Sequence, residues 1–410
     1  MKSNYKPIGD YIQRVEHRNR DLKVAKLLGL SMTKEFRETT SNIVGTDMSV
    51  YRVMSKYQFA CDFMSPIRVN KLPVVLKLDN EPNLVSPAYP VFEIIDRSKL
   101  DPEYLMMWFR RSEFDRYATF KCDAAIRGGY EWNELCETLI PIPSITKQKE
   151  IVKEYNVIQN RITLNQQLIQ KLEETAQAIY KQWFVDFEFP DENGKPYKSN
   201  GGEMVFNQEL EREIPKGWEL KPIGEVVETL GGGTPSTVES EFWENGEILW
   251  YSPTDVTKSD SIFSNTTEKK ITKLGLQKSS AKIFPAFSLL MTSRATIGKL
   301  TINTKEACTN QGFITLIPTE QISVYLLFDW IKTQLEEISS LATGSTFPEI
   351  SKSDFRNLKF IYPNEKATTL IDYQKPISIL YKVIQFRNEE NEKLIDMKNL
   401  LLSKLATIEN

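Results

Sequence analysis

The chain has 410 residues, of which 40% are hydrophobic and 26% charged, and its formal net charge is −3. This composition is typical of a soluble globular protein with two or three domains. No apolar run approaches the ~18 residues that a membrane-spanning helix needs, and no charged-then-apolar leader begins the chain. We therefore expect a cytoplasmic protein without a membrane segment.

Cysteine and histidine usage limits the chemistry of the chain. The four cysteines, Cys61, Cys122, Cys136 and Cys308, stand apart and form no C-x-x-C pair, so we expect reduced, packed thiols. The single histidine, His17, lies in a polar, charged stretch. A zinc site and a Ser-His-Asp triad are both disfavoured, and we expect no metal and no catalytic residue.

Residues 1–143 are expected to form a first globular unit. Strand-like stretches at Val74–Leu78 and Val91–Ile95 accompany a helical pattern at Pro102–Tyr117, which indicates a mixed helix-and-sheet domain. The unit closes on Leu139-Ile-Pro-Ile-Pro143, and proline is well tolerated just before a helix begins.

Residues 144–184 are expected to form a long helix. Apolar residues follow a heptad pattern, with alternating steps of four and three. The resulting seam consists of Ile151, Tyr155, Ile158, Ile162, Asn165, Ile169, Leu172, Ala176, Ile179 and Trp183. A stripe this narrow fits one partner helix, and the stretch from Lys147 to Phe184 would span about 57 Å.

Residues 185–217 are predicted to be a turn-containing connector, and its residues 185–215 include eight acidic and three basic residues. Residues 218–363 are predicted to be a second globular unit. This unit has a glycine turn at Gly231–Ser236, strands near Glu247–Tyr251 and Phe287–Met291, and a helix at Val324–Ser339.

Residues 364–410 are expected to form a second long helix, antiparallel to the first. Its less regular seam consists of Leu380, Ile384, Arg387, Asn391, Leu394, Met397 or Lys398, Leu401 and Leu405. Polar seam residues, such as Asn165 in the first helix, lower stability but fix register. Pro376 predicts a kink or a late start of this helix.

The order of parts repeats along the chain. Lys6-Pro-Ile-Gly9 recurs as Lys221-Pro-Ile-Gly224, Pro143 corresponds to Pro363, and Leu172 corresponds to Leu394, at nearly constant offset. The sequence therefore predicts an internal pseudo-twofold repeat: two α/β domains separated by two long antiparallel, coiled-coil helices.

A rigid spacer that carries two unlike domains suits a long ligand with two separated, unlike recognition sites, and duplex DNA is such a ligand. Arg pairs with guanine and Asn or Gln with adenine, while Ser, Thr and Lys contact phosphates. Basic clusters occur at Arg14–Lys26 and Arg110–Arg127. The candidate DNA contacts are Arg18, Arg20, Lys23 and Arg127 in the first domain, and Thr234, Ser236, Tyr251, Thr254, Ser293, Arg294, Thr296, Asn310 and Gln311 in the second.

An enzymatic function is disfavoured, because the chain lacks three motifs. These are the Asn/Asp-Pro-Pro-aromatic motif of adenine methyltransferases, a G-x-G-x-x-G cofactor loop and a G-x-x-x-x-G-K-[ST] phosphate loop. A coiled-coil adaptor that binds only proteins fits the repeat equally well. Steeply salt-dependent DNA binding would distinguish a DNA reader from such an adaptor.

Several segments resemble the specificity (S) subunit of type I restriction–modification systems. The most specific are Gln182-Trp-Phe-Val-Asp-Phe-Glu-Phe-Pro190, Gly201-Gly-Glu-Met-Val205 and Ile214-Pro-Lys-Gly-Trp218. The Ile-Pro-Ile-Pro exit, Ser293–Gly298 and Asn310–Gly312 are also similar to family signatures. The likeness covers essentially the whole chain.

The resemblance implies a non-catalytic subunit with two target-recognition domains, each of which reads one half of a bipartite, asymmetric site in double-stranded DNA. The helices would set the spacer and bind two modification (methyltransferase) subunits, and restriction (translocase/nuclease) subunits would join them. S-adenosylmethionine, ATP and Mg²⁺ are expected on those partner subunits, with no cofactor on this chain. A specificity subunit of a related restriction system remains the alternative.

Overall fold

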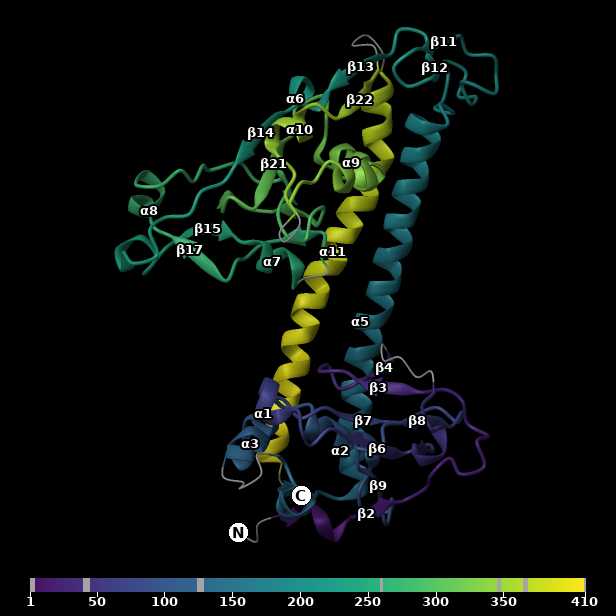
Figure 1. The fold of residues 1–410 in the computed structure, drawn as a ribbon, viewed down its shortest axis with the longest axis vertical. Helices are drawn as coiled ribbons and strands as arrows, with labels where there is room; N and C mark the ends of the chain where they lie inside the picture. The colour runs from purple at the N-terminus through teal and green to yellow at the C-terminus, as the bar shows by residue number, and fades with distance from the viewer. Residues whose placement is uncertain are drawn as a thin grey trace. The chain divides into compact units, whose positions relative to one another are not determined.

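A computed structural model describes residues 4–39, 45–123, 129–258, 261–344, 348–363 and 368–408. The chain forms two compact units: unit 1 contains Met1–Thr163 and Glu392–Asn410, and unit 2 contains Leu164–Asn391. Figure 1 labels their helices and strands. Each unit includes part of each long helix, whereas the sequence suggested that the helices are segments separate from the globular units. The helix halves belong to the units because they supply core residues to them.

Unit 1 is built on an antiparallel sheet with strand order β2-β9-β6-β7, flanked by the pairs β1–β10, β3–β4 and β5–β8. The strands are β1 (Tyr5–Pro7), β2 (Ile12–Val15), β3 (Leu28–Leu30), β4 (Phe36–Glu38), β5 (Arg52–Met54), β6 (Gln58–Cys61), β7 (Val74–Leu76), β8 (Asn83–Val85), β9 (Val91–Ile94) and β10 (Leu139–Pro141). The helices are α1 (Pro66–Val69), α2 (Pro102–Phe109), α3 (Ser112–Asp123) and α4 (Trp132–Glu137).

Aromatic packing joins α2 to the sheet of unit 1. Asp101 caps α2 by accepting from the backbone N–H groups of Glu103 and Tyr104, and Pro102 occupies the first turn. The ring of Phe109 lies edge-on to Phe59 and Phe92, with centroid separations of 6.0 and 6.3 Å. Burial of this aromatic cluster holds the helix on the sheet.

Unit 2 contains a five-stranded sheet of order β14-β21-β18-β19-β16 and a three-stranded sheet of order β17-β15-β20. The strands are β11 (Met204–Asn207), β12 (Arg212–Pro215), β13 (Glu219–Pro222), β14 (Glu228–Gly231), β15 (Ile248–Tyr251), β16 (Phe263–Ser264), β17 (Lys269–Ile271), β18 (Leu289–Thr292), β19 (Leu300–Asn303), β20 (Ala307–Thr309), β21 (Phe313–Ile317) and β22 (Lys359–Tyr362). The helices are α6 (Ile223–Val226), α7 (Pro253–Thr257), α8 (Lys273–Gln277), α9 (Val324–Ser340) and α10 (Lys352–Arg356).

Both units mix helix and sheet, as predicted, although most strand pairs are antiparallel. The parallel pairs are β15–β20 and β16–β19. The predicted connector, residues 185–217, contains more regular structure than turns alone, because β11 and β12 form a hairpin. Phe187 and Phe189, together with the adjacent Trp218, are buried in the core of unit 2.

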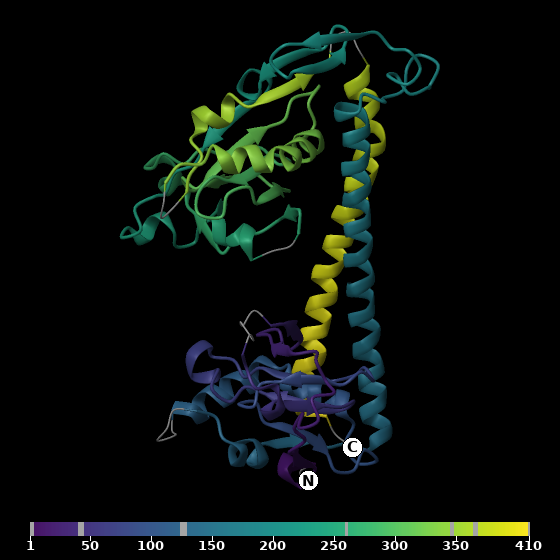
Figure 2. The same cartoon turned by 45° about the vertical axis from the view of Figure 1, so that its right-hand side comes forward.

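The two long helices are α5 (Ile145–Tyr180), which continues as a π-helical turn to Val185, and α11 (Thr369–Lys404). In both views they lie side by side (Figure 1, Figure 2). Within unit 2, Asn165 contacts Asn391 while Tyr180 contacts Tyr373. Within unit 1, Lys398 donates to Gln159. In unit 2 the partner on α11 moves from Asn391 to Tyr373 as α5 advances from Asn165 to Tyr180, so the two helices are antiparallel, as predicted.

The predicted seam of α5 is buried or half-buried throughout, including Ile158, Leu172 and Ile179. The Nδ2 of Asn165 donates to Asn391 Oδ1 and to Glu390 Oε2, both at 3.0 Å. The predicted polar seam residues therefore meet each other. A buried polar pair of this kind fixes the helix register.

Along α11, the positions Ile384, Leu394 and Leu401 are buried or half-buried, as expected of seam residues. Leu380 is half-buried as well, and its neighbour Tyr381, which the seam did not include, is fully buried. Pro376 lies inside the helix and does not delay its start. A proline in the second turn or beyond removes one backbone donor, and the buried neighbours Tyr373 and Ile377 hold this part of the helix in place.

A buried carboxyl joins α9 to both long helices within unit 2. Asp329 on α9 accepts hydrogen bonds from Tyr373 (2.9 Å) and Tyr381 (2.6 Å) on α11 and from Gln177 (2.5 Å) on α5. Burial raises the pKa of Asp329 to about 6, although the three donors counteract this shift. The network ties α9 of unit 2 to both long helices.

This raised pKa predicts a pH-dependent stability of unit 2. Because the folded-state pKa exceeds the reference value of 3.8, the protonated carboxyl stabilises the fold fully below that value, and the contribution is lost as pH rises through about 6. Relative to Asp329→Asn, the wild type should lose on the order of 3 kcal/mol of unfolding free energy between about pH 4 and about pH 7. Urea unfolding of both proteins across this range measures the difference, and parallel pH profiles would contradict the prediction.

The sequence repeat is visible in strand register. Lys6 pairs with Ile140 in β1–β10, and Lys221 pairs with Phe360 in β13–β22. The N–H of Ile8 donates to Thr138 O, and that of Ile223 donates to Leu358 O, both at 2.9 Å. The repeated motif requires glycine at its fourth position, because a side chain there would clash. A Cβ on Gly9 would lie 2.7 Å from Cys136 Cβ, and one on Gly224 would lie 2.8 Å from Arg356 Cβ.

The repeat extends further than the sequence anchors indicated. The order β2-β9-β6-β7 in unit 1 is matched by β14-β21-β18-β19 in unit 2. Val91 pairs with Val15 on one side and Ala60 on the other, and Ile314 pairs with Gly231 and Met291 in the same way. The two units therefore share a central antiparallel sheet and differ mainly in the segments inserted around it.

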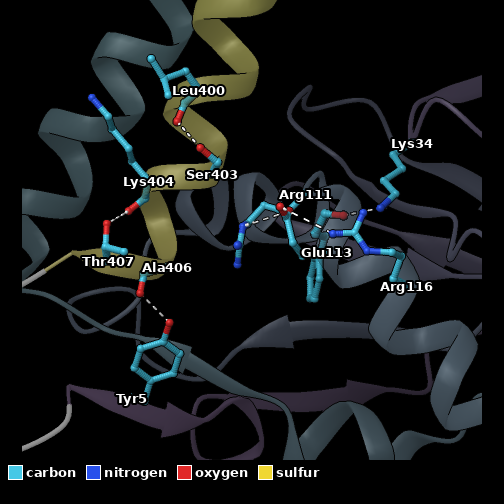
Figure 3. Close-up of polar contacts among 11 residues, drawn as sticks. Tyr5, Lys34, Arg111, Glu113, Arg116, Leu400, Ser403, Lys404, Ala406 and Thr407 are labelled. Atoms are coloured by element: carbon cyan, nitrogen blue, oxygen red, sulfur yellow. Dashed lines mark hydrogen bonds and ion pairs between the residues drawn. The ribbon is translucent and has the colours of Figure 1, made fainter.

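The end of the chain completes the core of unit 1. Leu402 and Leu405 are buried with Ile151 and Tyr155 of α5. The Tyr5 hydroxyl donates to Ala406 O at 2.7 Å, which fastens the first strand to the last turn of the chain (Figure 3). Along the described helices, no stretch combines the length and apolar content of a membrane-spanning segment.

Candidate nucleic-acid interface

Four segments of unit 2 leave their strands at one edge of the sheets. Strands β14 and β18 are both antiparallel to β21, so they run in the same direction. Their last residues, Gly231 and Thr292, therefore lie at the edge where β21 begins. The parallel strands β15 and β20 end side by side at Tyr251 and Thr309. We call the four segments that follow the loop edge of unit 2: residues 232–236, 252–254, 293–298 and 310–312.

Backbone hydrogen bonds join these segments to each other. Gly233 N donates to Thr309 O (2.8 Å), Asn310 N donates to Tyr251 O (3.0 Å), and Ser293 N donates to Gly312 O (2.8 Å). Gly232 is required where the first segment crosses the fourth, because a Cβ there would lie 2.0 Å from Asn310 O. Candidates far apart in sequence thus share one surface.

Arg294 projects from this edge and is held by a neighbouring segment. Its Nε donates to Glu349 Oε1 at 2.7 Å, with about half of each side chain exposed. The following Ala295 has a φ of 58°, and its N–H donates to Pro348 O at 3.1 Å. A guanine can be bound through the two terminal nitrogens of Arg294 while the Nε bond to Glu349 is kept.

The remaining polar candidates differ in exposure. Thr234 Oγ1 donates to Gln311 Oε1 at 2.7 Å, which orients the amide of the exposed Gln311. The side chains of Ser236, Thr254 and Thr296 are also exposed, and Asn310 is half-buried because its Oδ1 accepts from Gly312 N. These residues form a polar surface around Arg294.

Two predicted contacts lie in the core instead. Tyr251 is fully buried and its hydroxyl donates to Ser264 O at 3.1 Å. Ser293 is 3% exposed. Neither hydroxyl is available to a ligand in this structure. The sequence could not show this, because Tyr251 becomes buried only when β17 and β20 pair on either side of β15.

In unit 1, Arg18, Arg20 and Lys23 follow β2, at the position where residues 232–236 follow β14 in unit 2. The buried side chain of Asn19 folds this loop by donating to Val24 O and accepting from Val24 N. Arg20 and Lys23 are exposed, with Lys23 paired to Asp21 at 3.0 Å. Arg18 donates to Val50 O at 3.0 Å and is half-buried. Arg127 lies outside the described residues.

The second basic cluster of unit 1 is partly structural. Arg111 is 7% exposed, with its guanidinium 4.3 Å from the ring centre of Trp108 and 3.7 Å from Glu113, which also contacts Arg116 (Figure 3). Arg110 donates to the Tyr155 hydroxyl at 3.1 Å. Arg110 and Arg111 thus bind protein groups, and the burial of Arg111 removes it from the predicted DNA-facing cluster.

One residue was missed. Glu349 contacts Arg294 although 55 residues separate them in sequence. An acidic residue in a loop gave no sequence signal, and only its strand-like bridge to Arg294 reveals the contact. The described residues contain no cluster of three or more His, Cys, Asp or Glu side chains arranged to hold a metal ion.

Comparisons with known proteins place this geometry in a family. Residues 215–396 match the model of the type I restriction modification DNA specificity domain. The MjaIX specificity subunit of Methanocaldococcus jannaschii is 36% identical over 178 residues, which are 42% of this chain and 41% of that one. The HindI specificity subunit of Haemophilus influenzae is 26% identical over 357 residues, covering 74% of this chain and 76% of that protein.

A solved structure shows the same fold. The type I restriction–modification S subunit from M. genitalium matches with a TM-score of 0.54 at 13% identity, covering 99% of this chain and 96% of that one. The family match over the second unit and the relatives that extend across both units agree with the repeated scaffold. Residues 215–396 therefore match a type I restriction modification DNA specificity domain, and the chain is similar to specificity subunits of type I restriction–modification systems.

Proposed function

We propose that this chain is the DNA-recognition subunit of a type I restriction–modification complex and that each unit reads one half of a bipartite site. The observation that carries this proposal is the repeated sheet, from which polar, exposed loops leave at the same edge in both units. Different residues on a common scaffold suit the reading of two different short DNA sequences. The two long helices would set the spacer between the half-sites.

The outward faces of the helices suit methyltransferase subunits. Large apolar side chains are exposed at heptad spacing, with Val157 and Leu164 on α5 and Ile379, Phe386 and Leu400 on α11 between 56% and 63% exposed. Residues seven or fourteen apart lie on one face of a helix. Exposed apolar faces of this kind are typical of protein–protein contacts.

In this proposal the chain itself is not a catalyst. The partner subunits bind S-adenosylmethionine, ATP and Mg²⁺ and perform methylation, translocation and cleavage, and the complex works in the cytoplasm, where the DNA is. A related restriction system would use the same recognition chain with a different set of partners.

DNA binding tests the proposal directly. The full chain, assembled with its methyltransferase subunits, should bind a duplex with an affinity that falls steeply as salt rises, and sequencing of methylated DNA should show a bipartite motif. A chain that binds its protein partners and no duplex at any salt concentration is an adaptor, and the proposal would be wrong.

Arg294 offers the sharpest test in unit 2. Arg294→Ala should weaken binding of the assembled complex by about 1–3 kcal/mol and relax the motif at one position, since a bidentate guanine contact is lost. Lys305→Ala is the matched control, because Lys305 is exposed beyond the opposite end of β19. Titration of DNA and sequencing of the methylated sites measure both effects. Equal, small effects of the two substitutions would exclude a base contact by Arg294.

A further inference from the structure

We infer that the segment between β6 and β7 of unit 1, Asp62–Pro73, contacts the DNA phosphates through Arg68 and Lys71. The inference rests on the proposed function and extends it to residues that the sequence did not single out. It depends on the equivalence of the two central sheets and on the charge of this segment.

Strand order and register place the segment. In unit 2, the turn from β18 to β19 carries Arg294 and belongs to the loop edge. The equivalent strands of unit 1 are β6 and β7, because each pair occupies the third and fourth places of the shared strand order. Ala60 pairs with Val75 in unit 1 as Met291 pairs with Leu300 in unit 2. The connection that follows Cys61 therefore corresponds to the one that contains Arg294.

A second contact supports this correspondence. Tyr130 N donates to Phe63 O at 3.0 Å, and Ile350 N donates to Ser293 O at 3.1 Å. Both carbonyls lie within two residues of the strand end, and both donors precede the short helix, α4 or α10, that leads into the closing strand pair. The two connections are thus fastened by equivalent downstream segments.

The local fold of the segment exposes its cations. Asp62 accepts from Met64 N (3.0 Å) and from Ser65 Oγ (2.7 Å), which starts the short helix α1 at Pro66. The helix ends at Val69, and the following residue, Asn70, has a φ of 54°. Asp62 is thereby held within the turn, while Arg68 and Lys71 are exposed and have no ion pair within the described part of the chain.

The charge of the segment suits a polyanion. At the same edge of the sheet, Lys23 is neutralised by Asp21 and Arg18 donates to a backbone carbonyl. Among the residues that the structure describes, Arg68 and Lys71 have no such partner, and Asp62 is the sole acid in the sequence of residues 62–73. Exposed Arg and Lys side chains beside base-reading loops bind phosphates and position the protein on the duplex. The partner of this surface is therefore the backbone of double-stranded DNA.

The salt dependence of DNA binding tests this assignment in the complex assembled with its methyltransferase subunits. Arg68→Ala with Lys71→Ala should reduce the magnitude of the slope of log affinity against log salt by about 2, one for each lost phosphate contact, and leave the methylated motif unchanged. The charge-retaining pair Arg68→Lys with Lys71→Arg should keep the wild-type slope. Lys99→Ala is the control, since this exposed lysine follows β9 at the opposite edge of the sheet.

The outcomes distinguish a failure of the phosphate contacts at residues 62–73 from a failure of the proposed DNA recognition. If the alanine pair keeps the wild-type slope while Arg294→Ala weakens binding, the chain reads DNA and the assignment of residues 62–73 is wrong. If the alanine pair and Lys99→Ala lower the slope equally, the effect reflects total charge and the assignment also fails. If the wild-type complex shows no salt-dependent binding, the proposed function itself is refuted.

Discussion

Exchange of unit 1 for the corresponding unit of another specificity subunit is expected to change one half of the methylated DNA motif and leave the other half unaltered. The physical reason is that each unit has its own sheet, loop edge and hydrophobic core. Base contacts made by one unit therefore do not depend on side chains of the other. The result expected is a complete change of one half-site, which is the largest functional effect predicted for any substitution in this chain.

The exchange has to preserve the packing of the hydrophobic core of unit 1, which includes residues outside 1–143. A junction at residue 143 would leave four residues packed against a foreign domain: Ile151 and Tyr155 of α5, Leu402 of α11 and Leu405 directly after α11. A mismatched core side chain costs on the order of 1–3 kcal/mol. We therefore expect the chimaera that also takes these four residues from the donor to be more stable than the simple exchange of residues 1–143.

Sequencing of methylated DNA from cells that express either chimaera with the methyltransferase subunits gives the result. The reciprocal exchange of residues 218–363 is the matched control, and it should change the other half-site. Loss of both half-sites in a chimaera that remains folded and assembled would contradict independent reading by the two units.

Tyr373→Ala is expected to destabilise unit 2 by about 4 kcal/mol or more. The ring of Tyr373 is fully buried, with centroid distances of 5.0 Å to Phe184, 5.6 Å to Trp183 and 6.4 Å to Tyr180. Its removal leaves a cavity where α5 and α11 meet, and it also takes one hydrogen-bond donor from the buried Asp329. Both losses act in the same direction.

Two further substitutions separate these contributions. Tyr373→Phe keeps the ring and removes the hydroxyl, so we expect a loss of about 1–3 kcal/mol. Phe386 lies on the same helix and is 60% exposed. Phe386→Ala therefore removes an exposed aromatic ring and should change the free energy of unfolding by about 0.5 kcal/mol or less. Urea unfolding followed by tryptophan fluorescence compares the three variants. Similar losses for Tyr373→Ala and Phe386→Ala would show that the helix junction does not stabilise the unit.

Elements with a local residue pattern were predictable from the amino-acid sequence. The alternating steps from Ile151 to Trp183 specify a long helix, because the period of a helix places those side chains on one stripe. Asn165 and Asn391 were recognised as polar seam residues, and the structure shows that they bind each other. The repeated Lys-Pro-Ile-Gly motif was equally readable, since its glycine is required by a close backbone approach in each unit.

Contacts between segments far apart in the chain became known from the folded structure. The burial of Tyr251, the ion pair of Arg294 with Glu349 and the three donors around Asp329 all depend on contacts between residues far apart in the chain. The correspondence of β6–β7 with β18–β19 likewise rests on strand order and hydrogen-bond register. Periodicity reports how one element faces its surroundings, whereas strand pairing selects its neighbours, and no single stretch of sequence contains that choice.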